Sequence, residues 1–168
     1  MLPLRDSLIL KLAAIVGMRP GEILALQWGD LCEDGLRITR GMYRGIIQTS
    51  KSHHSVRTAA ISAGIREDLT SWHGLSRNTA PIDWVFPNEN GNKPLAHGNY
   101  WRRYIKPTLD TMKITGVTFQ VLRRTCASAL NGLGIQEELR HKAYALAAAE
   151  AACFRASSTT WPDESVSK

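Results

Sequence analysis

Three basic residues lie where the sequence changes from one element to the next, and their side chains are well suited to bind an anionic group. Arg19 follows an apolar run and precedes Pro20 and Gly21, Lys51 falls in a polar stretch between two strand-like segments, and Arg123 lies within "FQVLRRT". Each also has an ordinary structural interpretation: a cation at helix-end carbonyls, an exposed loop lysine, and an arginine that extends from a helix to solvent. The charge of the whole chain bears on which anion they could bind.

The basic residues are segregated along the chain. The net charge is +6, but residues 35–66 carry six basic and no acidic side chains, and residues 98–124 carry six basic side chains and only Asp110. These two stretches therefore sum to +11, which leaves −5 for the remainder. A solvated surface is the simple explanation of a charge run, whereas segregation into two blocks favours a polyanionic partner, because Lys and Arg release counterions condensed on phosphates.

Composition indicates one globular domain and excludes several other classes. The chain has 168 residues, of which 43% are hydrophobic and 21% charged, and it contains no apolar run long enough to span a membrane. Three widely spaced cysteines are typical of a reduced, cytoplasmic chain rather than a disulfide framework. His53 and His54 would point to opposite faces of a strand. We therefore expect no metal site.

Hydrophobic spacing predicts a mainly α domain with one small antiparallel sheet. Helices are expected at residues 4–16, 21–28, 65–75, 96–112 (bent at Pro107), 118–134 and 136–154. Three short strands are expected at residues 35–39, 42–48 and 56–61, followed later by a short strand and a turn-rich loop in "WVFPNENGNKP".

Three segments resemble the motifs of the tyrosine recombinases, also called phage integrases. "GMRPGEILALQWGDL" is similar to the first motif, with Gly17, Arg19 and Glu22 followed by Leu-x-Trp-x-Asp. "QTSKSHHSVRTAAIS" resembles the β-hairpin that carries a catalytic lysine, here Lys51, and "TFQVLRRTCASALNGLGI" resembles the His-x-x-Arg helix, with Arg123 as the arginine. The resemblance covers about residues 4–139 and implies the fold of the recombinase catalytic domain.

The resemblance implies DNA strand breakage and rejoining through a 3′-phosphotyrosine, with no cofactor. Arg19 and Arg123 would bind the non-bridging phosphate oxygens, since a guanidinium donates two parallel hydrogen bonds and stays charged. Lys51 would be the general acid for the leaving 5′-oxygen, and Glu22 would hold Arg19 in place. Gln120 replaces the family's histidine; it can donate a neutral hydrogen bond but cannot transfer protons as imidazole does.

The end of the chain departs from the family. The family's Leu-Gly-His motif would fall at Ala145–Leu146 and its nucleophilic tyrosine at Phe154–Arg155, and neither residue type is present. Phe154 keeps the ring but lacks the hydroxyl that attacks phosphorus. Tyr144 is the alternative nucleophile, although it comes about two and a half turns or more too early for a helical segment. We therefore expect strand cleavage to be impaired in this chain.

The resemblance also sets expectations for domains and partners. We expect residues 1–156 to form a catalytic-domain-like unit and residues 157–168 a disordered tail, and we expect the family's N-terminal core-binding domain to be absent. The expected partner is double-stranded DNA, with tetramers on DNA as in the family and a monomer in solution. The remaining expected DNA-binding residues are Arg40, Arg44, Arg57, Arg102, Arg103 and Arg124.

Two other functions stay open. The first is a non-catalytic DNA-binding remnant, which differs from a recombinase in forming no covalent adduct with DNA. The second is a helix-turn-helix regulator, suggested by the glycine-containing turn in "ASALNGLGIQEELRH". A regulator would lose base discrimination when the helix after Gly134 is altered and would be insensitive to Arg19, so it leaves the Arg19 motif unexplained.

Overall fold

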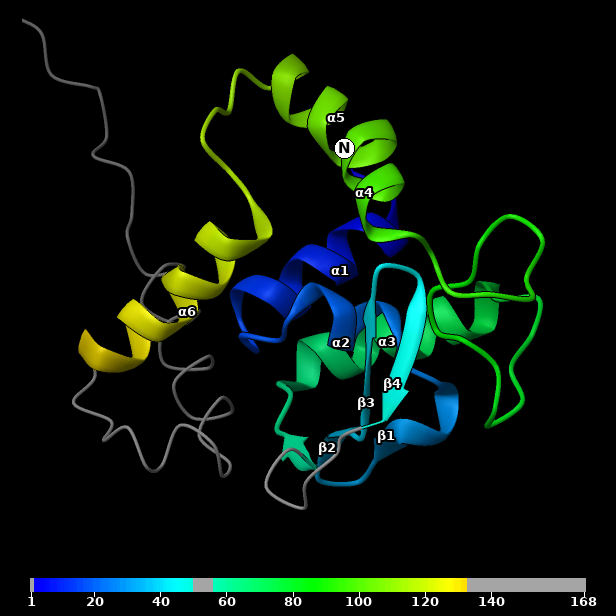
Figure 1. Cartoon of the computed structure of the whole chain (residues 1–168). Coiled ribbons are helices and arrows are strands. Elements are labelled where there is room, and N and C mark those ends of the chain that lie inside the picture. Colours follow the sequence, from blue (N-terminus) through cyan, green and yellow to red (C-terminus); the bar gives the residue numbers. More distant parts are fainter. Residues whose placement is uncertain (1, 50–55, 133–168) are drawn as a thin grey trace, which may run out of the picture.

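The computed structural model describes residues 2–49 and 56–132, and in this part helices and short strands surround a core centred on the first two helices (Figure 1). In chain order the elements are α1 (Leu4–Ala14), α2 (Pro20–Leu24), the 3₁₀ helix η1 (Trp28–Asp30), β1 (Leu31–Cys32), β2 (Gly35–Ile38), β3 (Arg40–Tyr43), β4 (Ile46–Thr49), β5 (Arg57–Ala59), α3 (Ala63–Leu75), α4 (His97–Tyr100), the π-helical turn η3 (Trp101–Ile105), α5 (Lys106–Thr111) and α6 (Phe119–Gly132). The mainly α class with antiparallel strands is confirmed. No helix within residues 2–49 and 56–132 is long and apolar enough to cross a membrane.

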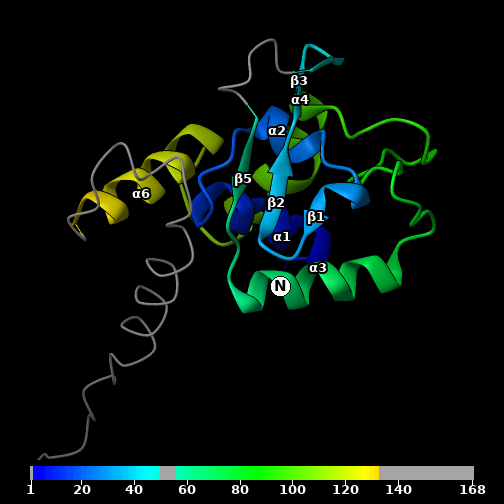
Figure 2. The ribbon, with the colours of Figure 1, turned by 90° about the horizontal axis from the view of Figure 1, so that it is seen from below.

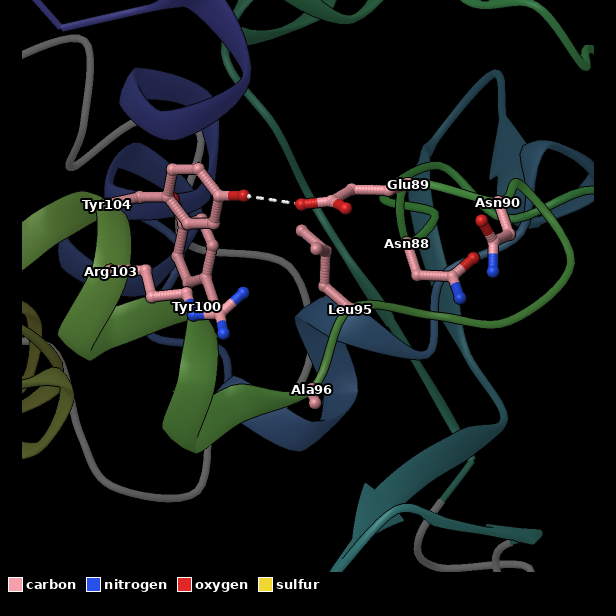
Figure 3. A pocket seen from close by; sticks show the side chains of 8 residues that line it. All are labelled: Asn88, Glu89, Asn90, Leu95, Ala96, Tyr100, Arg103 and Tyr104. Carbon is pink, nitrogen blue, oxygen red and sulfur yellow. Dashed lines mark hydrogen bonds between the residues drawn. The ribbon is translucent and has the colours of Figure 1, made fainter.

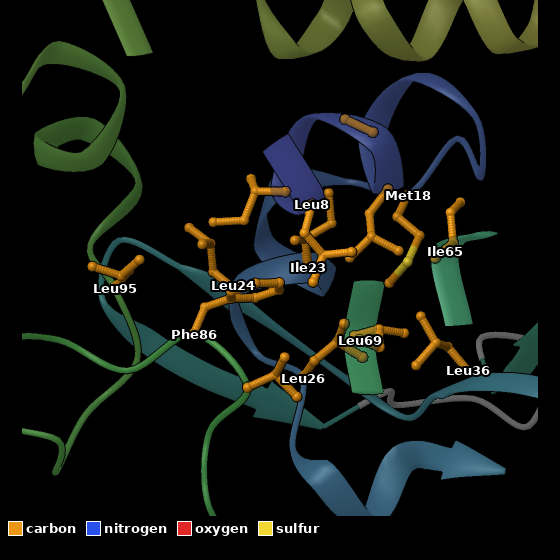
Figure 4. Close-up of a cluster of buried hydrophobic side chains, with 14 of the residues drawn as sticks. Leu8, Met18, Ile23, Leu24, Leu26, Leu36, Ile65, Leu69, Phe86 and Leu95 are labelled. Atoms are coloured by element: carbon orange, nitrogen blue, oxygen red, sulfur yellow. The ribbon is translucent and has the colours of Figure 1, made fainter. Parts of the chain in front are cut away.

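The core forms around α1, as its helical spacing predicts. Leu8, Ile9 and Leu12 are fully buried on one face of this helix. They pack with side chains from α2, β2 and α3, among which Ile23 and Leu69 lie at the centre of the cluster (Figure 4). Since these residues come from distant parts of the sequence, the core fixes α2 and the strands relative to α1.

The strands form two separate sheets rather than the single sheet expected. The first has the antiparallel order β1-β2-β5, and the second is the β3–β4 hairpin (Figures 1 and 2). The segment 42–48, expected to be one strand, is corrected to the two arms of this hairpin: Tyr43 pairs with Ile46 across a turn at Arg44 and Gly45. Both turn residues have positive φ, 50° and 79°, the conformation of a type I′ turn.

The helix expected at residues 21–28 is shorter than predicted. α2 ends at Leu24, because the following backbone bonds to a distant segment instead of continuing the helix. The Val85 N–H donates to the Leu26 carbonyl at 2.9 Å, and the Trp28 N–H donates to the Asp83 carbonyl at 3.0 Å. This segment forms two isolated bridges, Gln27 with Trp84 and Pro87 with Pro94, so the short strand expected in "WVFPNENGNKP" does not form.

The helix expected at residues 96–112 is interrupted just before Pro107, where a bend was predicted. Residues 101–105 adopt the wider π-helical turn η3, which leads into α5. Proline lacks an N–H group and its ring crowds the carbonyl four residues earlier, so the regular α-helical bonding changes in this turn. The helix expected at 136–154 and the tail at 157–168 lie outside the described residues.

Candidate functional site

The carboxylate of Glu22 lies at the centre of the site and is saturated with hydrogen bonds. Glu22 as a whole is only 8% exposed. Oε2 accepts from the Arg19 backbone N–H at 2.8 Å and from Arg57 Nη2 at 2.8 Å, while Oε1 accepts from Arg19 Nη1 at 3.0 Å and from Arg57 Nη1 at 3.1 Å. A carboxylate offers about four lone-pair sites, and all four are occupied here. Glu22 therefore holds other groups in place.

The electrostatic balance keeps Glu22 ionised. Burial raises the pKa of this carboxyl, but the hydrogen bonds from Arg57 and Arg19 and the positive charge of Arg57 outweigh burial and lower the pKa below its ordinary value. An anionic carboxylate with no free lone pair is not suited to proton transfer. Its chemical effect is to orient the two guanidinium groups that it accepts from.

Arg19 is positioned by the junction between α1 and α2. Gly17 has a φ of 70° after the end of α1, a conformation that glycine adopts without strain. Pro20 is the first residue of α2, so Arg19 is the residue immediately before the helix, and its backbone N–H is bonded by Glu22. The Arg19 side chain is 59% exposed. The junction between α1 and α2 thus exposes the Arg19 guanidinium to solvent, while its Nη1 atom stays bonded to Glu22.

The site also needs α2 to approach the β3–β4 hairpin closely, and Gly21 allows this. A Cβ atom at Gly21 would lie 2.3 Å from the backbone oxygen of Met42, in β3. No side chain fits at that distance. The glycine after Pro20 is therefore required by packing between the helix that carries Glu22 and the hairpin.

Arg123 reaches the same site from α6. This helix (yellow in Figure 1) lies beside the C-terminal end of α1, where the Cys126 thiol donates a hydrogen bond to the Ile15 carbonyl at 3.2 Å. Burial lowers the pKa of Arg123, and the positive charges of Arg19 and Arg57 lower it further, while Glu22 acts in the opposite sense. Arg123 is therefore within electrostatic reach of all three groups.

We call Arg19, Arg57 and Arg123, together with Glu22, the arginine cluster. Two guanidinium groups donate to one carboxylate and the third, that of Arg123, lies within electrostatic reach of it, so the cluster has a net charge of two positive units. Such a cluster can accept a further anion, and arginine forks match the geometry of phosphate oxygens. The chemistry available here is anion binding by fixed, permanently charged donors.

The other predicted site residues are distributed over several surfaces. Gln120 is exposed on α6, one turn before Arg123, and Arg124 is exposed on the same helix. Arg40 is engaged with buried Asp30 at 2.9 Å. Arg44 lies at the hairpin turn with its guanidinium 5.3 Å from the Tyr43 ring centre.

Two of the expected catalytic residues, Lys51 and Tyr144, lie outside the described residues, as do His53 and His54. Within the described residues, no group of three or more His, Cys, Asp or Glu side chains is arranged to hold a metal ion. The site as described is therefore built from arginine donors and one carboxylate.

A separate hollow lies between the loop around residue 89 and the α4–η3 helix (Figure 3). It measures about 190 Å³, and Arg103, Glu89 and Tyr104 are among its lining residues. The Tyr104 hydroxyl donates to Glu89 at 3.1 Å. No member of the arginine cluster lines this hollow, and its carboxylate opposes phosphate binding, so the two sites are distinct.

Comparison with known proteins assigns the family. The sequence model described as the phage integrase family matches residues 1–146. No curated protein matches the sequence. Among solved structures, the Tn1549 transposon integrase in complex with transposon right end DNA has a TM-score of 0.66 at 17% identity, over 83% of this chain and 50% of that one. The same integrase in complex with circular intermediate DNA has a TM-score of 0.63 at 18% identity, over 90% of this chain and 59% of that one.

The chain thus spans about half of the length of the integrase chains that it matches. The match extends over the first-motif segment at Arg19 and the helix that carries Arg123, the two segments whose side chains the fold brings together. The chain therefore belongs to the phage integrase family and has the fold of a tyrosine recombinase catalytic domain.

Proposed function

We propose that the chain is the DNA-binding catalytic domain of a site-specific tyrosine recombinase, which acts on double-stranded DNA in integration and recombination. The observation that carries this proposal is the convergence of Arg19 and Arg123, from separate motifs, on one carboxylate-organised cluster with two net positive charges. DNA complexes of a structurally similar integrase support the choice of DNA as the anion.

In this proposal the cluster binds one phosphodiester group. Arg19 and Arg123 donate to its non-bridging oxygens, where negative charge gathers as a nucleophile attacks phosphorus. Gln120, exposed one turn before Arg123, donates a neutral hydrogen bond to the same phosphate. Lys51 protonates the leaving 5′-oxygen, so that strand cleavage and religation need no cofactor.

The nucleophile is the part of the reaction that this sequence does not supply at the family's spacing. Phe154 stands where the family has tyrosine, and Tyr144 is the remaining candidate. Strand cleavage by this chain is therefore impaired. The presence of Phe154 in place of the family's tyrosine favours a second candidate function, a non-catalytic DNA-binding module that binds phosphate without cleaving the strand.

Contacts outside the cluster would hold the DNA backbone without reading its sequence. Exposed arginines suited to this role lie at the hairpin turn, on the α4–η3 helix and on α6: Arg44, Arg102, Arg103 and Arg124. The charges of Arg40 and Arg57 alone also suggest backbone contacts, but both side chains are engaged within the protein, with Asp30 and Glu22 respectively. The protein would act in the cytoplasm as a monomer that forms tetramers on DNA.

A nicked suicide substrate tests cleavage, because loss of a short fragment prevents religation. The chain is incubated with this DNA and resolved on a denaturing gel, with Tyr144→Phe as the control variant. We expect salt-sensitive binding with little or no covalent adduct, the result for impaired cleavage. An adduct that forms efficiently and disappears in Tyr144→Phe would establish a full recombinase and overturn the impairment. Absence of any DNA binding would overturn the function itself.

A further inference from the structure

We propose that Arg57 is a positioning residue that orients Arg19 through Glu22, and is not itself the primary ligand of the DNA phosphate. This inference rests on the proposed function of the arginine cluster. It assigns to Arg57 a task different from the direct DNA contact that its charge alone suggests.

Arg57 and Arg19 differ in their hydrogen bonds to Glu22: Arg57 is the inner residue and Arg19 the outer one. Arg57 directs both terminal nitrogens at Glu22, one to each carboxylate oxygen, in a fork that fixes the plane of the carboxylate. Arg19 uses one terminal nitrogen and its backbone N–H on the two remaining acceptor positions. The Arg57 side chain is 23% exposed, against 59% for Arg19, so Arg19 is the member that faces an incoming anion.

Arg57 belongs to the three-stranded sheet, a different part of the fold from α2. It begins β5, where it pairs with Ile38 of β2, and Ile38 is buried in the core. Glu22, in contrast, belongs to a helix of five residues that has few internal hydrogen bonds of its own. The fork therefore links the start of α2 to the three-stranded sheet and determines where the Arg19 guanidinium points.

The neighbouring charges strengthen this requirement. Arg19, Arg57 and Arg123 repel one another, and Glu22 is the acidic group that acts on Arg123 alongside them. If Arg57 no longer held the carboxylate, Glu22 could rotate toward either remaining arginine, and Arg19 would lose a single defined orientation. The geometry of the phosphate site therefore depends on the contact between Arg57 and Glu22.

A double-mutant cycle on DNA binding separates positioning from direct contact. The full chain is titrated with a fluorescein-labelled duplex by anisotropy, comparing wild type, Arg57→Gln, Glu22→Gln and the double variant, with thermal unfolding as a check that each folds. We expect Arg57→Gln to weaken binding about tenfold in the wild-type background and less than about twofold when Glu22 is already Gln, since coupled residues are strongly non-additive. An equal loss in both backgrounds means direct contact and overturns the inference.

Two further variants make the result specific. Arg57→Lys keeps the charge but loses the fork, so it should still bind DNA several-fold more weakly than wild type; full rescue by lysine would overturn the inference. Arg37→Gln removes one exposed charge from the adjacent strand and measures the effect of charge alone, which should be smaller than that of Arg57→Gln. If Arg19→Ala also binds normally, the proposed function fails; if Arg19→Ala weakens binding while the Arg57 and Glu22 effects are additive, only the positioning role fails.

Discussion

Glu22 and Asp30 are two buried carboxylates with the same local construction but different surroundings. Each lies in the first turn of a short helix and accepts the backbone N–H three residues earlier, and each pairs with an arginine from a following strand, Arg57 and Arg40 respectively. Glu22 also accepts from the exposed Arg19 side chain, whereas Asp30 accepts from Arg40 as its arginine partner among the described hydrogen bonds. The same local construction therefore supports packing at Asp30 and the proposed anion site at Glu22.

Removing either carboxylate should give the largest effect on stability. Glu22→Ala and Asp30→Ala each leave a partly buried arginine unpaired, and we expect each to lower the free energy of unfolding by about 2 kcal/mol. Urea denaturation measures this. DNA binding separates the pair, because Glu22→Ala should weaken it about tenfold and Asp30→Ala by much less. Equal losses of binding would mean that the two carboxylates do not differ in function.

Replacing Arg19 or Arg40 tests the same difference between the two carboxylates, with a smaller expected loss of stability. Arg19→Ala should reduce the slope of log affinity against log salt by about one, since one phosphate contact is lost. Its unfolding free energy should change by less than about 1 kcal/mol, because the side chain is mostly exposed. Arg40→Ala should reverse this order, with a larger loss of stability than of DNA affinity. The measurements are a salt titration of DNA binding and a urea melt.

The site's contacts differ in how far the sequence predicts them. The Arg19–Glu22 contact follows from spacing within one turn, and it is present in the structure. The Glu22–Arg57 contact depends on where β5 pairs with β2, which no local pattern specifies. The local sequence pattern does not predict the hairpin turn at Arg44 and Gly45, because arginine is not a residue typical of a positive φ, although the following glycine is. The sequence therefore predicts the local contact of the site, between Arg19 and Glu22, whereas long-range packing adds Arg57.

Lowering the pH should reduce the stability that the ion pairs of Glu22 contribute. The pKa of Glu22 is lower in the folded chain than its ordinary value of 4.5, so its ion pairs contribute full stability above about that pH and lose it as pH falls through the folded pKa. Wild type should therefore lose more stability than Glu22→Gln between pH 6 and pH 3 (approximate limits chosen around the carboxyl pKa range). Parallel pH profiles from thermal unfolding would contradict this account.

The smallest expected effect is at the hairpin turn. Arg44 is exposed and touches the Tyr43 ring, so Arg44→Gly should change the unfolding free energy by less than about 0.5 kcal/mol. Glycine tolerates the positive φ at this position, which isolates the effect of the side chain. A salt titration then shows whether this arginine contributes one phosphate contact. A large loss of stability would place the hairpin turn among the structural elements instead.

The most direct test of the arginine cluster is the salt dependence of duplex DNA binding for wild type and the Arg19→Gln, Arg123→Gln double variant. We expect the double variant to stay folded, to bind DNA more weakly, and to have a slope of log affinity against log salt reduced by about two, one for each lost phosphate contact. A folded double variant with the wild-type slope and affinity would contradict the assignment of these arginines as a phosphate site.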